Sequence, residues 1–191
     1  MKTLILSYPG CIMFEVMLAS ELLSKSLPVE IATPEGDDLV STTGITFKAN
    51  HAYSSVQIQD YACILVPGGD PSEVMENAQI DNVLQEANKL GTIIGAICAG
   101  PVVLAKAGLL KQRQFTHGYG DHHKDFLAPF WLNAKFVDAP VMVANHIVTA
   151  KPEAHVEFAV TVAQLAGVLR STEECDYFRN FYLGRRIAKP T

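Results

Sequence analysis

The fold of this chain is decided by one short stretch, Ile93-Ile94-Gly95-Ala96-Ile97-Cys98-Ala99-Gly100-Pro101-Val102-Val103-Leu104. Its first five residues form an apolar, largely β-branched run, which predicts a buried strand. The residues from Gly100 onward predict a helix, because proline is favoured in a first helical turn, where its missing N–H would have no partner. Cys98 therefore stands where a strand gives way to a helix. Small neighbours allow a sharp turn there, as a nucleophile elbow requires.

The position of Cys98 favours an ionised thiol. The amino end of a helix offers free N–H groups and a partial positive charge, worth about 0.3–1 kcal/mol to an anion. The thiolate is the form of cysteine that acts as a nucleophile and that is oxidised. We therefore predict a reactive cysteine that is more readily ionised than an ordinary thiol. The alternative is a small buried side chain that fills a tight turn, which is the commoner role of a free cysteine.

A second strand end carries glycines that suit the same site. Residues 62–66 predict a buried strand that stops at Pro67-Gly68-Gly69-Asp70. Glycines let backbone N–H groups approach a ligand or an oxyanion closely. The carboxyl ends of adjacent strands in an open α/β sheet form the usual ligand crevice. We therefore expect Gly68 and Gly69 to border the same crevice as Cys98.

Short apolar runs alternate with helical stretches along the chain, which is typical of a parallel sheet covered on both faces. We predict strands over residues 3–7, 29–33, 62–66, 92–97, 114–116, 141–143 and 147–150. We predict helices over residues 13–24, 77–90, 100–107 and 153–169, and another in the aromatic tail after residue 172. Residues 39–47 predict a small antiparallel hairpin. The predicted class is α/β: a single three-layer α/β/α domain over residues 1–191 with a mostly parallel sheet.

The composition excludes several classes of partner. Fifteen Lys and Arg against twenty Asp and Glu give a net charge of −5, which argues against nucleic acid and against an anionic membrane surface. Charged residues are 18% and hydrophobic residues 49% of the chain, so we expect extensive burial that includes a subunit interface. The longest uncharged stretch, residues 91–105, falls short of the ~20 residues of a membrane span.

Neither the amino terminus nor the cysteines indicate an oxidising compartment. The apolar run at residues 3–6 is broken by Ser7-Tyr8-Pro9-Gly10, so it is too short for a secretory signal. The cysteines lie far apart, with no Cys-x-x-Cys pair and no zinc spacing. We expect reduced thiols in a cytoplasmic protein, of which Cys98 alone is reactive; the four are Cys11, Cys63, Cys98 and Cys175.

The motif Ala96-Ile97-Cys98-Ala99-Gly100-Pro101, preceded by Val66-Pro67-Gly68-Gly69, resembles the ThiJ/PfpI superfamily. It is most similar to the branch that contains the parkinsonism-associated deglycase, and the likeness runs from the first strand to the closing helix. The resemblance implies a flavodoxin-like sandwich, related to the class I glutamine amidotransferase fold. It also implies a homodimer and one reactive cysteine at the elbow. The chain has no cofactor-binding motif, so we expect no bound cofactor.

Glu15 is the first partner that the resemblance assigns to Cys98. In the superfamily, a carboxylic acid from the start of the first helix hydrogen-bonds the cysteine sulfur, and Glu15 occupies the matching position. Its apolar neighbours predict burial, which raises the pKa of a carboxyl group and keeps it protonated. A neutral carboxyl can donate to a thiolate, and a hydrogen bond to a charged group is worth about 1.5–3 kcal/mol. The alternative is a solvated glutamate in the first turn of a helix.

His117, in Thr116-His117-Gly118, matches the superfamily position of a histidine near the cysteine. Such a histidine could act as a general base or orient a water. The alternative is a structural histidine, and the neighbouring His122 and His123 weaken the signal. A metal site from His117, Asp121, His122 and His123 is disfavoured, because adjacent histidines point apart on a helix. We therefore predict no metal.

Two departures from the superfamily pattern bear on activity. The protease-like branch has a histidine directly after the nucleophile, where this chain has Ala99, which puts peptidase activity in doubt. A Gly-Pro-Gly turn often follows the last strand, and here Lys151-Pro152-Glu153-Ala154-His155 replaces it. His155-Val156-Glu157 is similar to the His-x-Glu of amidotransferases, but neighbours on a helix face different ways, so we interpret this match as chance.

Together these residues predict a cysteine-dependent enzyme whose substrate is a small electrophile, with glyoxalase or deglycase chemistry implied by the resemblance. Cys98 would add to a carbonyl and form a hemithioacetal, while Glu15 and His117 move protons. Backbone N–H groups of Gly68, Gly69 and Ala99 would border the oxyanion. An alternative is an oxidation sensor that holds a Cys98 sulfinate through Glu15. Hydrolase, hydratase, peptidase or amidotransferase-like chemistry remains a third hypothesis, because fold alone does not choose among them.

Overall fold

The structure is a computed structural model in which a seven-stranded sheet runs in the order β10-β11-β7-β6-β1-β2-β5. It describes residues 1–185, except for the side chains of Asp121 and Lys124. The strands are β1 (Lys2–Leu6), β2 (Val29–Thr33), β5 (His51–Ala52), β6 (Tyr61–Val66), β7 (Ile93–Ile97), β10 (Val141–Ala144) and β11 (Ile147–Ala150). Every pairing is parallel except that of β10 with β11.

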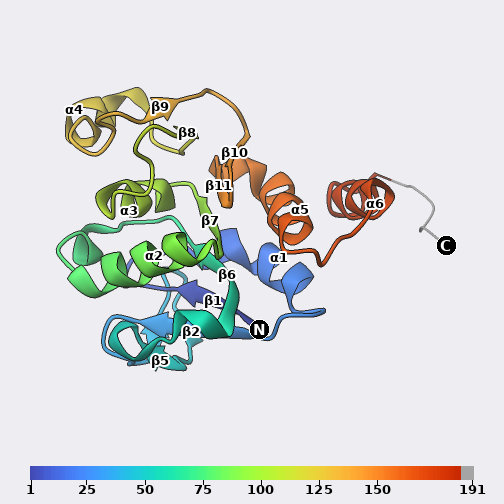
Figure 1. The fold of residues 1–191 in the computed structure, drawn as a ribbon, viewed down its shortest axis with the longest axis horizontal. Helices are drawn as coiled ribbons and strands as arrows, with labels where there is room; N and C mark the ends of the chain where they lie inside the picture. Colours follow the sequence, from blue (N-terminus) through green and yellow to red (C-terminus); the bar gives the residue numbers. More distant parts are fainter. Residues whose placement is uncertain (186–191) are drawn as a thin grey trace.

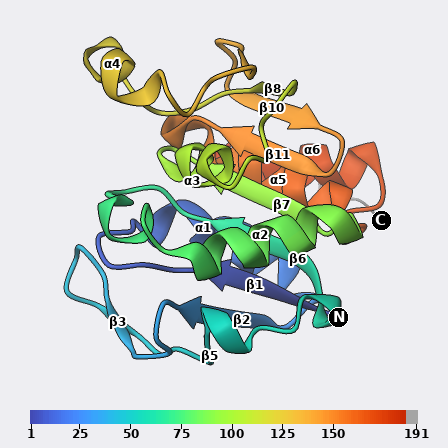
Figure 2. The same cartoon turned by 60° about the vertical axis from the view of Figure 1, so that its left-hand side comes forward.

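Helices cover both faces of this sheet (Figure 1, Figure 2). On one face lie α2 (Ala78–Leu90) and α3 (Gly100–Lys106), and on the other lie α1 (Phe14–Leu23) and α5 (His155–Leu165). The final helix, α6 (Thr172–Tyr182), packs against the outer side of α5. The predicted three-layer α/β/α arrangement with a mostly parallel sheet is confirmed.

The central strands are buried because both of their faces are covered. All described side chains of β11 and all but the first residue of β1 and β7 are buried, as their continuous apolar runs predict. The helices end where the sequence provides caps. The Asn77 side chain accepts from the amides of Gln79 and Ile80 at the start of α2, and Gly91 ends that helix in a left-handed conformation.

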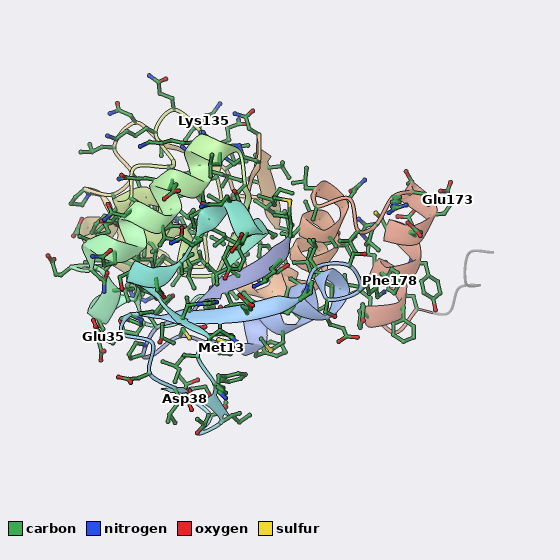
Figure 3. The ribbon with its side chains drawn as sticks, turned by 60° about the horizontal axis from the view of Figure 1, so that its bottom comes forward. Met13, Glu35, Asp38, Lys135, Glu173 and Phe178 are labelled. Carbon is green, nitrogen blue, oxygen red and sulfur yellow. The ribbon has the colours of Figure 1, made fainter. Side chains whose placement is uncertain are left out.

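Several two-residue strands and 3-10 helices lie outside the main sheet. The predicted hairpin is present as β3 (Leu39–Val40) paired antiparallel with β4 (Thr46–Phe47), and Figure 3 shows it near Asp38, projecting from the body. A separate two-stranded sheet joins β8 (Gln114–Phe115) to β9 (Lys135–Phe136), and α4 (Lys124–Leu127) lies between them. Short 3-10 helices cover Tyr53–Ser55, Ile58–Asp60, Ser72–Val74, Asp121–His123 and Pro152–Ala154.

The differences from the predicted elements are local. The closing helix is shorter than predicted, because α5 is preceded by the 3-10 turn Pro152–Ala154 and ends at Leu165. The strands β5 and β9 were not predicted, because two residues carry no readable alternation. The predicted strand at residues 114–116 forms but pairs outside the main sheet. None of the helices within residues 1–185 is long and apolar enough to cross a bilayer.

The registers bring three strand ends to one edge of the sheet. Val66 at the end of β6 pairs with Ala96, and Ile97 at the end of β7 pairs with Ala150 at the end of β11. The strands β6 and β7 run directly into the turns that hold Gly68, Gly69 and Cys98, and β11 runs into the loop at residues 151–155. The expected crevice edge is therefore the carboxyl edge of β6, β7 and β11.

Candidate functional site

Cys98 sits on a strained turn between β7 and α3. Its φ is +61°, in the left-handed region that side chains other than glycine rarely adopt, at a cost of about 1–2 kcal/mol. Two backbone hydrogen bonds hold the turn: the Cys98 amide donates to the Ala150 carbonyl at 2.9 Å, and the Gly118 amide donates to the Cys98 carbonyl at 2.8 Å. The neighbouring loops therefore impose the elbow that the sequence predicted.

Glu15 reaches this turn from the first turn of α1. Its side chain is only 5% exposed. The Gly68 amide donates to Oε2 at 2.8 Å, and the Cys98 thiol donates to the same carboxylate. The structure thus brings Glu15 and Cys98 into contact, although the two residues are distant in sequence.

Two glycines leave space for this contact. A Cβ on Gly68 would lie 2.6 Å from the Cys98 Cβ and 2.6 Å from Glu15 Oε2. A Cβ on Gly118 would lie 3.2 Å from the Cys98 Sγ and 2.7 Å from the Pro152 ring. Backbone therefore approaches the thiol from two loops, and a side chain at either position would have to displace a member of the site.

The protonation of the pair differs from what the sequence predicted. Burial raises the pKa of the Cys98 thiol to about 12, and the charge of the Glu15 carboxylate and the hydrogen bond to it act in the same direction. Burial also raises the pKa of Glu15, against the opposing effect of its hydrogen bonds with Cys98 and Gly68. The raised pKa of Cys98 contradicts the predicted readily ionised thiol, whereas the raised pKa of Glu15 has the predicted direction and cause. Ionising both groups would place two buried negative charges side by side.

Because both pKa values are raised, the site disfavours two negative charges at once. A thiolate forms here when its proton passes to Glu15, because this state keeps a single negative charge in the site. The amides of Gly69 and Ala99 donate to the sulfur and stabilise its charged form. The Gly68 amide, predicted to border an oxyanion, already binds Glu15 and positions that carboxyl group.

His117 lies beside the elbow in an aromatic cluster. Its ring stacks on Trp131 with centroids 5.3 Å apart, and the Tyr119 amide donates to its Nδ1 at 3.0 Å. Burial and the charge of Lys151 lower the pKa of His117, which favours the neutral ring. No hydrogen bond or ion pair joins this ring to Cys98 or Glu15 within residues 1–185. The residue that reaches the sulfur is the next one, Gly118.

The remaining predicted histidines lie further along the same loop. The rings of His122 and His123 are 4.0 Å apart, and the His123 ring meets Tyr119 edge-on at 5.1 Å. Among the side chains that the structure describes, no group of three or more His, Cys, Asp or Glu is placed to hold a metal. The Asp121 side chain lies outside that description.

Two residues of the site were not predicted. Tyr119 lies near Cys98 and Asp70. Burial is the main cause that raises its pKa to about 12, and the charges of these two neighbours contribute less. His155, at the start of α5, packs its ring 5.4 Å from that of Phe14, and its charge lowers the pKa of Glu15. Tyr119 could have been found from its place beside His117, whereas His155 approaches Glu15 only through the packing of α5 on α1.

The other cysteines differ from Cys98 in exposure. Cys11, Cys63 and Cys175 are buried, and Cys98 is partly exposed. The His-x-Glu match is also resolved by the structure, since Glu157 accepts from the Arg179 Nε at 2.7 Å and not from His155. Cys98 is thus the cysteine that combines access, strain and a carboxyl partner.

The sequence is similar to one protein family and to several characterised and uncharacterised proteins. The DJ-1/PfpI family matches residues 1–165. The glutathione-independent glyoxalase DJR-1.2 of Caenorhabditis elegans is 28% identical over 153 residues, which cover 78% of this chain and 80% of that protein. YoaZ of Bacillus subtilis, named as an uncharacterized protease, is 26% identical over 166 residues, which cover 86% of this chain and 77% of that protein.

Solved structures agree on the fold. Atu0886, a DJ-1 superfamily protein from Agrobacterium tumefaciens, matches with a TM-score of 0.81 over 97% of this chain and 100% of the other, at 22% identity. At 22% sequence identity, this similarity shows that the two proteins share a fold and shows nothing about a shared activity. The family match covers most of the chain and includes Glu15, the Gly68-Gly69 turn and the Cys98 elbow. The chain therefore belongs to the DJ-1/PfpI family, as its two strand-end motifs predicted.

Proposed function

We propose that this protein is a cysteine-dependent enzyme that converts small 2-oxoaldehydes to 2-hydroxy acids. One observation carries the proposal: a partly exposed thiol on a strained elbow lies against a buried carboxyl group and the backbone amides of Gly69 and Ala99. A buried acid that can take the thiol proton and return it is the device that carbonyl addition needs. The relative named as a glyoxalase supports the choice of substrate class.

The first step joins substrate and enzyme. The Cys98 thiol passes its proton to Glu15, and Sγ attacks the aldehyde carbon to form a C–S bond. The carbonyl electron pair moves to oxygen, which the Gly69 and Ala99 amides are placed to stabilise, and oxygen then takes the proton from Glu15. The product is a hemithioacetal, with every atom of thiol and aldehyde retained.

The second step releases the product. The carbon bonded to sulfur loses its proton to a base, and the neighbouring carbonyl carbon gains one, which gives the thioester of a 2-hydroxy acid. Water hydrolyses this thioester and restores the thiol. Glu15 is the base in contact with the sulfur. We assign the neutral His117 ring to the attacking water, because it precedes Gly118, whose Cβ position lies 3.2 Å from Sγ.

Turnover of methylglyoxal tests the proposal. The wild-type protein is expected to form lactate from methylglyoxal, and Cys98→Ser to form none above the uncatalysed rate. Cys63→Ser is the matched control, because it changes a cysteine buried in β6 away from the elbow. Equal lactate formation by wild type and Cys98→Ser would overturn the assignment of Cys98 as nucleophile.

An oxidation sensor is the second candidate, and the same contact favours it. A neutral Glu15 carboxyl would donate to a sulfinate on Cys98, which is the accessible cysteine of the chain. Peroxide converts the thiolate to a sulfenate and then to a sulfinate, releasing one water at each step. A stable gain of two oxygens at Cys98 without turnover of aldehydes would favour sensing. Turnover of aldehydes by the reduced protein favours the enzyme.

We further propose a homodimer that forms through the face of α1 and the β3–β4 hairpin. Phe14 is 65% exposed, Val40 61% and Ile45 58%, and Phe14 and Ile45 line an apolar hollow of about 240 Å³. Covering such side chains is what an apolar subunit interface does. The mass in solution is expected to be twice that of the chain and to fall to one chain in Ile45→Glu, and a monomeric wild type would contradict the proposal.

A further inference from the structure

A hollow of about 350 Å³ opens beside the Cys98 elbow. One wall is the loop after β6, with Gly69, Asp70 and Met75, and the other is the segment after His117, with Tyr119, His123 and Phe126. Its size suits a small ring, since pockets for small molecules begin at about 300 Å³. The two walls come from segments that are distant in sequence and meet only in the folded chain.

Two residues that line the hollow, Gly69 and Tyr119, also lie close to Cys98. The Gly69 amide that lines it donates to Sγ of Cys98. On the other wall, Tyr119 follows Gly118, whose Cβ position lies 3.2 Å from Sγ. The hollow is therefore near enough to the sulfur to take a substituent on a carbon bonded to it.

The walls combine aromatic surface with one carboxylate. Phe126 is 55% exposed and Met75 is half-buried, so both offer apolar contact to a ring. Asp70 is held in place because its Oδ1 accepts from the Ser72 amide at 3.0 Å. Among the lining residues whose side chains the structure describes, no Lys or Arg balances that charge.

Polar groups in the hollow have unused hydrogen-bonding capacity. Nδ1 of His123 is buried and has no hydrogen-bond partner within the described part of the chain. The Tyr119 phenol is protonated at neutral pH, since burial raises its pKa further above the ordinary value of about 10, so it remains a donor. A neutral ring that carries a carbonyl group beside it would meet donors near the sulfur and apolar contact further in.

We propose that this hollow is the substituent subsite of the enzyme and that it selects 2-oxoaldehydes bearing an uncharged aromatic group over those bearing a carboxylate. The inference rests on the proposed function in that Cys98 is taken as the nucleophile. It goes further by assigning Phe126 and Asp70 as specificity residues. Phe126 supplies the ring contact, and Asp70 repels a negative charge.

Matched substrates test the charge and the ring separately. Phenylglyoxal and 4-carboxyphenylglyoxal differ by a carboxylate, and methylglyoxal lacks the ring. For the wild type, kcat/KM is expected to be about fivefold higher for phenylglyoxal than for its carboxy analogue, since a like charge near the surface is repelled modestly. Asp70→Asn keeps the Oδ1 that binds the Ser72 amide, and it is expected to remove this difference.

The ring contact is tested by Phe126→Ser. This variant is expected to lower kcat/KM for phenylglyoxal relative to methylglyoxal by about tenfold, the usual scale for lost apolar contact in a pocket. Phe181→Ser is the matched control, because Phe181 is a similarly exposed ring, 58% against 55%, on α6 at the far side of the molecule from α4 (Figure 1). It is expected to leave the ratio unchanged.

A second readout needs no turnover. Phenacyl bromide and 4-carboxyphenacyl bromide alkylate a thiolate with loss of bromide, and intact mass follows the rate at Cys98. Each rate is divided by that for 2-mercaptoethanol to remove intrinsic reactivity. The wild type is expected to favour the uncharged reagent, and Asp70→Asn to lose that preference.

The outcomes separate the two proposals. Turnover of all three aldehydes with ratios that neither Asp70→Asn nor Phe126→Ser alters would overturn the subsite and leave the proposed function standing. Absence of turnover, together with an alkylation preference that Asp70→Asn removes, would overturn the proposed function and support the subsite.

Discussion

The Gly68 amide donates to Oε2 of Glu15 across 2.8 Å, and a Cβ on Gly68 would lie 2.6 Å from that same oxygen. The loop after β6 therefore holds the carboxyl group by a backbone hydrogen bond and leaves no room for a side chain at Gly68. The same added Cβ would also lie 2.6 Å from the Cβ of Cys98. The carboxyl–thiol pair thus depends on a position that has no side chain.

Gly68→Ala is expected to separate this pair. The added methyl group would have to displace Glu15 or Cys98, so methylglyoxal turnover should fall on the order of 10²-fold, as small displacements of catalytic groups do. Gly95→Ala is the control, because its Cβ would press on the Phe158 ring in the core and leave the site untouched. Urea unfolding should show a loss of stability in both variants, with activity per folded molecule retained in Gly95→Ala.

Glu15→Gln is expected to lower the pKa of the Cys98 thiol. Burial is the largest cause of the raised pKa, and the negative charge of Glu15 is the second largest. The substitution removes this charge and leaves the Gly69 and Ala99 amides in place. The titration of thiolate absorbance at 240 nm should shift from about 12 toward the ordinary cysteine value of roughly 8.5. A rise of the pKa in this variant would show instead that a neutral Glu15 donates to a thiolate in the resting protein.

Native thiol labelling is expected to modify Cys98 alone. Cys11, Cys63 and Cys175 are buried, so an aromatic disulfide reagent at pH 8 should react with one equivalent of thiol per chain, and with all four cysteines in denaturant. Because its pKa is raised, Cys98 should also react more slowly than free cysteine. Cys98→Ser should show no reaction under native conditions, and more than one rapid equivalent in the wild type would contradict the burial.

Stability at acid pH is expected to depend on Glu30. Burial opposes its charge, but hydrogen bonds from Lys2, Tyr61 and His51 outweigh that effect and lower its pKa to about 2. The stabilisation is therefore complete above the unfolded pKa of roughly 4.3 and is lost as pH falls toward 2. The loss should be on the order of 1–2 kcal/mol, discounted for partial exposure.

Urea unfolding between pH 5 and pH 2.5 measures this dependence. Glu30→Gln should be less stable than the wild type at pH 5 and should change less over the interval. Glu86→Gln, at an exposed position on α2, is the control and should follow the wild type. Parallel curves for the wild type and Glu30→Gln would exclude Glu30 as the source.

Local signals in the sequence were enough to predict the elbow and the layers. Pro101 and the small residues around Cys98 specify a strand-to-helix turn without reference to the rest of the chain, and the structure has it. The asparagine before α2 and the glycine after it likewise mark that helix to within a residue. The hairpin around Thr43-Gly44 was predictable for the same reason, since its turn chemistry is local.

The protonation of the site could not be predicted in this way. The pKa of Cys98 depends on how deeply the thiol is buried and on a charge that arrives from α1, and neither is encoded near residue 98. The hollow lined by Asp70 and Tyr119 likewise joins two segments whose distance is set by the packing of the folded chain. Sequence motifs therefore identified the residues, and tertiary structure determined their electrostatics.

The left-handed backbone at Cys98 has a consequence for the balance between folding and chemistry. If thermal stability alone were selected, glycine would be expected at position 98, because glycine adopts a φ of +61° without steric penalty. Cys98→Gly should therefore melt at a higher temperature than the wild type, by the few degrees that about 1 kcal/mol provides, while losing its reactive group. The difference in melting temperature between the two proteins, measured by calorimetry, would give the stability that is lost by having a cysteine at this turn.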